Sequence, residues 1–171
     1  MRIDNIFLGF IDTQTIYKVK IDHMSEISDS DFSTPEAAET AFYTAFADCD
    51  VKAMNTIWAS ANVICIHPGS SALVGREAVM RSWSNMLSNA ELPNIRVNVL
   101  SRLTEGGLAV HVVEEHITSG YGESATASMV LATNVYRREE GVWRLLEHHA
   151  SVPRFQKRGM SADKPSQHTL Q

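Results

Sequence analysis

Residues 63–83, VICIHPGSSALVGREAVMRSW, change from one structural pattern to another at the centre of the chain. The β-branched and apolar run 63–66 is typical of a buried strand. Pro68 and Gly69 end that run, because proline lacks a backbone donor and glycine allows a turn. Residues 76–87 then carry apolar side chains at helical spacing. The stretch therefore predicts a strand, a tight turn that begins at a histidine, and a helix.

Two more helices are predicted before this stretch. Ser33 or Thr34 can cap the first one, with Pro35 in its first turn and apolar residues at helical spacing over 37–46. Asp50 can begin a second, shorter helix. Both helices present an apolar stripe that must be covered by another element.

After residue 94 the sequence pattern changes from that of helices to that of strands. The predicted strands are 95–104, 108–118, 124–138 and 142–152, and the short separators EGG, SGYGE and EEG are typical of hairpin turns. Three helices, a short strand between two of them, and an antiparallel meander form an α+β order. Long, strongly twisted strands curl around the helices, so we expect a cavity between sheet and helices.

The composition divides the chain into three parts. Residues 33–155 are the expected domain. Residues 1–32 are an amino-terminal extension, either disordered or loosely packed, and Met24 is an alternative start of translation. Residues 156–171 contain almost no apolar side chains and are expected to be a disordered tail.

Charge and cysteine content exclude several classes of protein. The chain has 15 Lys and Arg against 20 Asp and Glu, a net charge of −5, without a basic cluster, which argues against nucleic-acid binding. Cys49 and Cys65 fit neither a disulfide framework nor a metal-ligand spacing, so both are expected to be reduced. No segment is typical of a signal peptide or a membrane span, and we expect a cytoplasmic protein that does not contact membranes.

The order of these motifs is similar to that of a known family. Two helices, CIHPG, G-R-E-A-V-x-x-S-W, a strand glutamate, TNVY and the closing W-x-x-x-E-H-H-A-S together resemble the SnoaL-like branch of the nuclear transport factor 2-like superfamily, which includes ketosteroid isomerase. The resemblance covers about residues 34–153. It implies a cone-shaped, curved antiparallel sheet with a mixed edge, wrapped around three amino-terminal helices, with a pocket inside. It also implies a homodimer.

Three polar side chains on otherwise apolar strands are the candidate catalytic residues. His67 ends the short strand, where it can lie at the rim of the pocket. Glu115 matches the glutamate of the family pattern, with Glu114 as the less favoured alternative for the inward position. Adjacent residues of a strand point to opposite faces, so only one of His148 and His149 can line the cavity, and we expect His149.

Five further residues are expected to line the pocket. They are Trp58, Trp83, Asn134, Trp143 and Ser151. No metal site is expected, because His111 and His116 are five residues apart on one strand and point to opposite faces.

The predicted function is acid–base chemistry on a small, largely apolar molecule. An apolar pocket shifts carboxylate and imidazole pKa values toward neutrality, which favours proton transfer. The chain would then be an isomerase or dehydratase that needs no cofactor. The alternative is a non-catalytic dimeric module for ligand binding or association.

Overall fold

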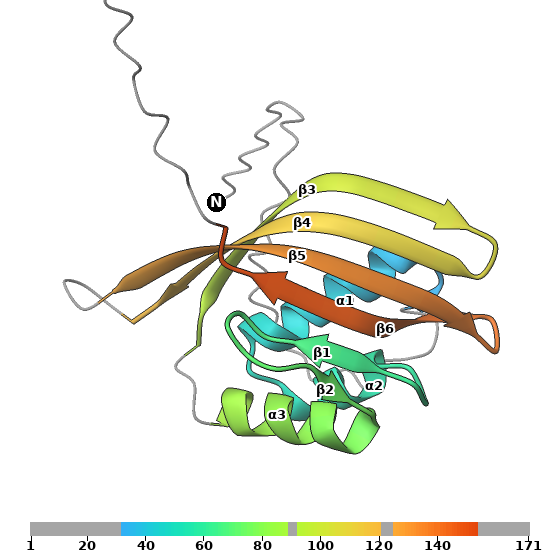
Figure 1. Ribbon diagram of the computed structural model, residues 1–171, viewed down its shortest axis with the longest axis horizontal. Helices are drawn as coiled ribbons and strands as arrows, with labels where there is room; N and C mark the ends of the chain where they lie inside the picture. The colour runs from blue at the N-terminus through green and yellow to red at the C-terminus, as the bar shows by residue number, and fades with distance from the viewer. Residues whose placement is uncertain (1–31, 89–91, 121–124, 154–171) are drawn as a thin grey trace, which may run out of the picture.

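Nine helices and strands make up the described part of the protein, a computed structural model that covers residues 32–88, 92–120 and 125–153 (Figure 1). Their order is α1 (Pro35–Ala47), α2 (Val51–Ile57), β1 (Ile64–Ile66), β2 (Leu73–Val74), α3 (Arg76–Ser88), β3 (Asn94–Glu105), β4 (Leu108–Ser119), β5 (Thr126–Glu139) and β6 (Val142–Ser151). The expected tail, and the expected amino-terminal extension apart from Phe32, lie outside the described residues. The three helices, the short strand and the four-strand meander are confirmed.

Side-chain caps determine where the first two helices begin. The Thr34 hydroxyl accepts a hydrogen bond from the backbone N–H of Ala37 at 3.1 Å, so Thr34 rather than Ser33 is the cap of α1. The Asp50 carboxylate accepts from the backbone N–H of Ala53 at 2.8 Å and caps α2. The two caps thus place α1 and α2 at the start of the domain.

The six strands form one mixed sheet in the order β2-β1-β6-β5-β4-β3. β1 runs parallel to β6, and every other neighbouring pair is antiparallel. The parallel pairing places Cys65 beside His148. This topology confirms the α+β fold with a mixed edge and joins the end of β1 to the middle of β6.

The turn after β1 explains the His-Pro-Gly sequence. The backbone N–H of Ser70 donates to the carbonyl of His67 at 3.0 Å, and Gly69 adopts a φ of +74°, which favours glycine. The chain then forms β2, a two-residue edge strand that the sequence analysis did not predict. Leu73 and Val74 are too few to show an alternating pattern, and they are a strand only because they pair with β1.

The helices cover the inner face of the sheet. In Figure 1, α1 lies behind the curved strands β3–β6, and α3 runs beside β1 and β2. Between these layers the rings of Phe42, Phe46 and Trp83 pack edge to face, with centroids 5.2–5.3 Å apart for the two pairs that include Trp83. This aromatic cluster borders the buried polar residues described below.

Candidate functional site

A chain of hydrogen bonds crosses the inner face of the sheet. The Tyr43 hydroxyl on α1 lies 2.7 Å from Oε1 of Glu115 on β4. Nδ2 of Asn134 on β5 donates to the Tyr43 oxygen at 2.9 Å, and Oδ1 of Asn134 lies 2.7 Å from Nδ1 of His148 on β6. All four side chains are buried, so the chain links three neighbouring strands and one helix within the core.

The direction of these bonds fixes the tautomer of His148. An amide oxygen can only accept a hydrogen bond, so Nδ1 of His148 must carry the proton that is donated to Asn134. Burial lowers the pKa of His148 to about 3, with the nearby His67 and His149 acting in the same direction. The neutral ring therefore keeps a lone pair on Nε2.

The other end of the chain holds a carboxyl group that titrates near neutrality. Burial raises the pKa of Glu115 to about 7, and the hydrogen bond from Tyr43 only partly opposes this shift. Burial, together with the Glu115 charge, raises the pKa of the Tyr43 hydroxyl well above its usual value. Tyr43 thus stays protonated, whereas Glu115 can gain or lose a proton near pH 7.

His67 reaches the same region from β1. Its Nε2 lies 3.0 Å from the hydroxyl oxygen of Ser82 on α3, and its ring centroid lies 5.2 Å from that of Trp83. Trp83 is in turn 5.9 Å from the ring of His148. Burial lowers the pKa of His67, so the ring favours its neutral form. Trp83 therefore contacts both histidines, and Glu115 is connected to His148 through Tyr43 and Asn134.

Cys65 lies between these histidines but is not a nucleophile at neutral pH. Its Sγ is 3.7 Å from Nε2 of His67, and the residue is fully buried. Burial raises the pKa of the thiol to about 12, so the thiolate is scarce.

A second buried polar cluster lies further along the same inner face. The Glu39 carboxylate on α1 binds Nδ1 of His111 at 2.7 Å and also pairs with the guanidinium of Arg102. Burial alone would raise the pKa of Glu39, but its hydrogen bonds with His111 and Arg102 outweigh that effect and lower it. His111 and Asn134 are cross-strand partners, so this cluster adjoins the hydrogen-bond chain.

The expected inward orientation of His149 was wrong. His148 is 2% exposed and points to the core, whereas His149 and Ser151 are exposed on the outer face. The cause is a β-bulge: Tyr136 pairs with Leu145 and Val135 with Glu147, which leaves Leu146 as an extra residue. One extra residue reverses the alternation that starts at Trp143, and the two histidines exchange faces.

The remaining orientations on β4 and in the core agree with the sequence analysis. Glu115 is buried and Glu114 is partly exposed, and His111 and His116 point to opposite faces. Of the residues expected to line a pocket, Trp58, Trp83, Asn134 and Trp143 are buried, and Ser151 is exposed on the outer face. Burial alone does not test whether they line a pocket.

Two hollows on the surface lie away from this buried chain. One, of about 340 Å³, is formed by the ends of β3, β4 and β5 and includes Arg96 and His116. The other, of about 790 Å³, lies between α2 and the β5–β6 hairpin and includes Trp58 and Arg144. Neither is lined by Glu115, Tyr43, Asn134 or His148.

Four residues of these clusters were not anticipated: Glu39, Tyr43, Ser82 and Arg102. Glu39 and Tyr43 are four residues apart on α1, so they lie on one helix face, and that face packs on the sheet. This spacing was a usable signal, because two polar residues interrupt an otherwise apolar helix face. Ser82 carried no comparable signal, since a single serine in a helix is usually a solvent-facing residue.

Comparison with known proteins places these features in a family. A model of the SnoaL-like domain matches residues 36–154. A structure from Thiobacillus denitrificans, provisionally named a calcium/calmodulin-dependent protein kinase type II association domain, is 39% identical. The match covers 72% of this chain and 98% of that one, with a TM-score of 0.67.

Two further relatives carry different names. A structure from Streptomyces avermitilis, provisionally named a dehydratase of the nuclear transport factor 2-like family, is 30% identical over 75% of this chain and all of that one, with a TM-score of 0.65. The F-box protein SKIP8 of Arabidopsis thaliana is 23% identical over 117 residues, which are 68% of this chain. The match spans about half of that curated relative, 48% of its length.

The fold comparison points the same way as the family model. A nuclear transport factor 2-like protein from Salmonella enterica shares the fold at 14% identity, with a TM-score of 0.62. No helix among the described residues is both long and apolar enough to span a membrane.

The match to the SnoaL-like domain model and the similar structures together identify the family. The chain belongs to the SnoaL-like domain family of the nuclear transport factor 2-like superfamily.

Proposed function

We propose that this protein binds a small, largely apolar molecule and catalyses its isomerisation or dehydration by general acid–base chemistry, without a cofactor. The observation that supports this most is the directional hydrogen-bond chain from His148 through Asn134 and Tyr43 to Glu115. It connects a neutral imidazole with a carboxyl group whose pKa is about 7. That carboxyl group can accept and return a proton at neutral pH.

The candidate roles follow from the protonation states. Glu115 in its ionised form would remove a proton from a carbon next to a carbonyl group, while neutral His148 would hold Asn134 in place. Once Glu115 has taken the proton, the Tyr43 hydroxyl would turn from it and donate a hydrogen bond to the developing negative charge. His67, held by Ser82 and packed against Trp83, would return the proton or assist a departing hydroxyl group.

The provisional name of the Streptomyces avermitilis relative supports the same reaction class. Dehydration of a β-hydroxy carbonyl compound and migration of a β,γ double bond both begin with removal of an α-proton. A test can therefore detect that shared step before the true substrate is known.

The experiment measures proton exchange at the α-carbon in D₂O. The full chain is incubated with a panel of β-hydroxy and β,γ-unsaturated ketones, and loss of the α-proton signal is followed by ¹H NMR. We expect at least one compound to exchange faster than in buffer. Glu115→Gln should slow that exchange by roughly 100-fold, the usual contribution of one acid–base group. His148→Gln, which removes the imidazole that holds Asn134, should slow it to a smaller extent.

His149→Gln is the matched comparison, because it changes the adjacent histidine on the outer face. It should exchange at the wild-type rate. A panel in which every compound exchanges at the buffer rate would contradict the proposed catalysis, and so would equal effects of the His148 and His149 substitutions.

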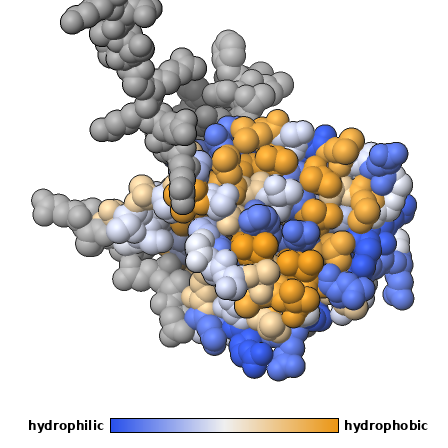
Figure 2. Space-filling view, in the orientation of Figure 1, coloured by the Kyte–Doolittle hydropathy of each residue, from blue (hydrophilic) through white to orange (hydrophobic). Residues whose placement is uncertain are grey.

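A second candidate function, association with further copies of the chain, has its own support. The Thiobacillus denitrificans relative is named for an association domain. Figure 2 shows apolar residues among polar ones on the sheet face opposite the helices. Half-buried apolar side chains on that face include Val110, Val112, Leu131 and Val135. A non-catalytic dimeric module would use this face and would leave the buried chain a structural role.

A further inference from the structure

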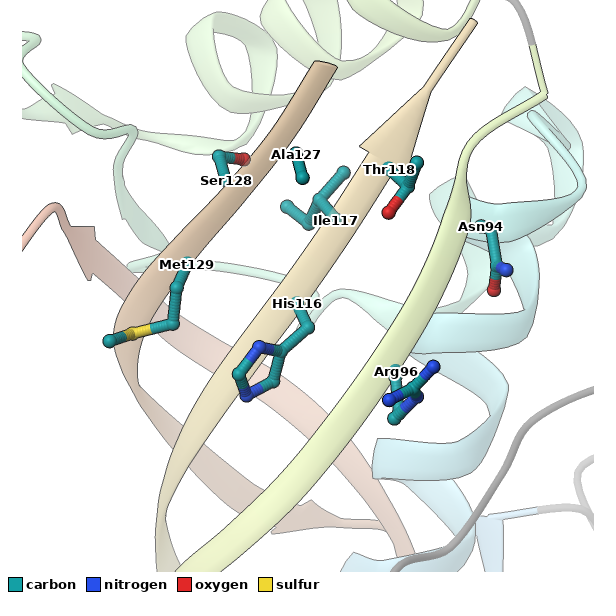
Figure 3. Close-up of a pocket in the computed structure, with 8 residues that line it drawn as sticks. All are labelled: Asn94, Arg96, His116, Ile117, Thr118, Ala127, Ser128 and Met129. Atoms are coloured by element: carbon teal, nitrogen blue, oxygen red, sulfur yellow. The ribbon is translucent and has the colours of Figure 1, made fainter. Parts of the chain in front are cut away.

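The outer face of the sheet has a hollow of about 340 Å³ where β3, β4 and β5 lie side by side. Figure 3 shows Arg96, His116 and Met129 on these three neighbouring strands. They are consecutive cross-strand partners, Arg96 with His116 and His116 with Met129, so their side chains leave the sheet together. The volume is at the lower end of the range for small-molecule sites.

Arg96 differs from the other arginines of the described ranges. Each of the others donates to a carboxylate or to a backbone carbonyl: Arg76, Arg81, Arg102, Arg137, Arg138 and Arg144. For Arg96 no acceptor lies within hydrogen-bond distance in the described ranges, although the chain as a whole has a net charge of −5. Its planar fork of N–H donors lines the hollow, and none of the described residues accepts a hydrogen bond from it.

The carboxylate of Glu114, two residues before the strand partner of Arg96, is held by other residues. Its Oε2 accepts from Nδ2 of Asn98 at 3.0 Å and lies 3.7 Å from Nε2 of His116. The guanidinium of Arg96 therefore brings one positive charge to the hollow, which suits one negative charge better than two.

The remaining lining combines hydrogen-bonding and apolar groups. Asn94 and Thr118 supply amide and hydroxyl groups, and Met129 supplies an apolar wall. A carboxylate bound by the Arg96 fork would place a short apolar tail against Met129. An inorganic anion would leave that wall unused.

We propose that this hollow is a binding site for a small monocarboxylate with a short apolar chain, held by Arg96 and positioned by His116 and Met129. It is separate from the buried chain of the proposed reaction, since it lies on the opposite face of the sheet. It is therefore a second ligand site, whether or not the interior is catalytic.

The test uses sodium butyrate as the probe and the full chain as the protein. Binding is followed at constant ionic strength by NMR, through the Nε–H signal of Arg96 and the methyl signal of Met129. We expect both signals to move and to saturate together. Butyramide has the same shape without the charge. Its affinity should be lower by about tenfold or more, because a charge-assisted bidentate contact is lost.

Two substitutions locate the charge. Arg96→Gln should weaken butyrate binding by about tenfold, as expected for loss of a charged hydrogen-bond partner. Arg81→Gln is the control, because Arg81 is exposed on α3 and already pairs with Glu77. It should leave the affinity unchanged.

Several results would overturn the proposal. These are equal binding of butyrate and butyramide, an Arg96→Gln variant that binds as wild type, and inorganic phosphate that competes fully without moving the Met129 signal. The dimer that the apolar residues of this face favour must leave the hollow open. Movement of both signals on dilution of the protein alone would show a second copy in the hollow and would also overturn the proposal. None of these results depends on the α-proton exchange assay.

Discussion

His148 and His149 are neighbours in sequence but lie in opposite environments. His148 is buried and donates to Asn134, whereas His149 is exposed beyond the bulge. Removal of the inner imidazole leaves the Asn134 carbonyl without its donor and also leaves a cavity beside Trp83. Removal of the outer imidazole does neither.

We therefore expect His148→Ala to lower the free energy of unfolding by roughly 2–4 kcal/mol, and His149→Ala by about 0.5 kcal/mol or less. Urea denaturation followed by circular dichroism measures both values under one condition. Equal losses for the two variants would contradict the orientation of these side chains.

The shifted pKa values of Glu115 and His148 make opposite contributions to stability as the pH changes. Glu115 has a folded-state pKa of about 7 against an ordinary value of 4.5, so it stabilises the fold at low pH and loses that contribution as the pH rises toward 7. His148 has a folded-state pKa of about 3 against 6.5, so it stabilises the fold at higher pH and loses that contribution as the pH falls toward 3. Between pH 4.5 and 6.5 the two effects should nearly cancel.

Each substitution should reveal the contribution of the other residue. In that pH range the unfolding free energy of Glu115→Gln should rise with pH, by up to roughly 1.4 kcal/mol per unit, relative to wild type. That of His148→Gln should fall with pH by a similar amount. Denaturant titrations at intervals of half a pH unit check both slopes, and variant curves parallel to the wild-type curve would show that neither pKa is shifted.

A residue of the site could be predicted when the spacing of its neighbours determined the face to which its side chain points. Glu115 was predictable, since β4 alternates regularly around it and Glu114 takes the opposite face. His148 was not, because one bulge residue in β6 reverses the alternation and no local pattern marks its position. The spacing of Glu39 and Tyr43 marks a polar helix face, but the hydrogen bond of Tyr43 joins it to a residue 72 positions away, a partner that no local pattern identifies.

At the scale of elements, the helix boundaries were the most predictable feature, because caps act locally. Thr34 and Asp50 lie three residues before the amides that they cap, so sequence alone contains both partners. β2 was not predictable, since a two-residue strand exists only through its pairing with β1.

The identity of the α1 cap gives a direct test at this scale. Thr34→Ala should lower the free energy of unfolding by about 1 kcal/mol, because the N–H of Ala37 loses its side-chain acceptor. Ser33→Ala is the matched control and should change it by a few tenths at most. Thermal or denaturant unfolding of the two variants distinguishes them, and a larger loss in the Ser33 variant would move the cap by one residue.

At the scale of the whole molecule, the sheet has two different faces. The inner face is covered by helices, whereas the outer face carries half-buried apolar side chains such as Val112 and Leu131, with the exposed Leu103 and Leu108 nearby. An antiparallel sheet tolerates solvent on one face, but that face is then usually polar. The apolar character of the outer face favours contact with a second copy of the chain through a two-fold interface.

We expect the protein to be a dimer at micromolar concentration, with a mass by light scattering of twice the 19.0 kDa of one chain. Val112→Glu and Leu131→Glu each place a carboxylate on the outer face, where burial against the partner leaves it without a counter-charge. Both variants should shift the mass toward that of one chain and keep a cooperative unfolding transition, because neither side chain belongs to the inner core. Leu92→Glu is the control, since Leu92 is 62% exposed and lies before β3 rather than within a strand, and this variant should remain dimeric. A wild-type protein that is monomeric at this concentration, or variants that keep the dimer mass, would exclude the outer face as the interface and would leave the association function without its structural support.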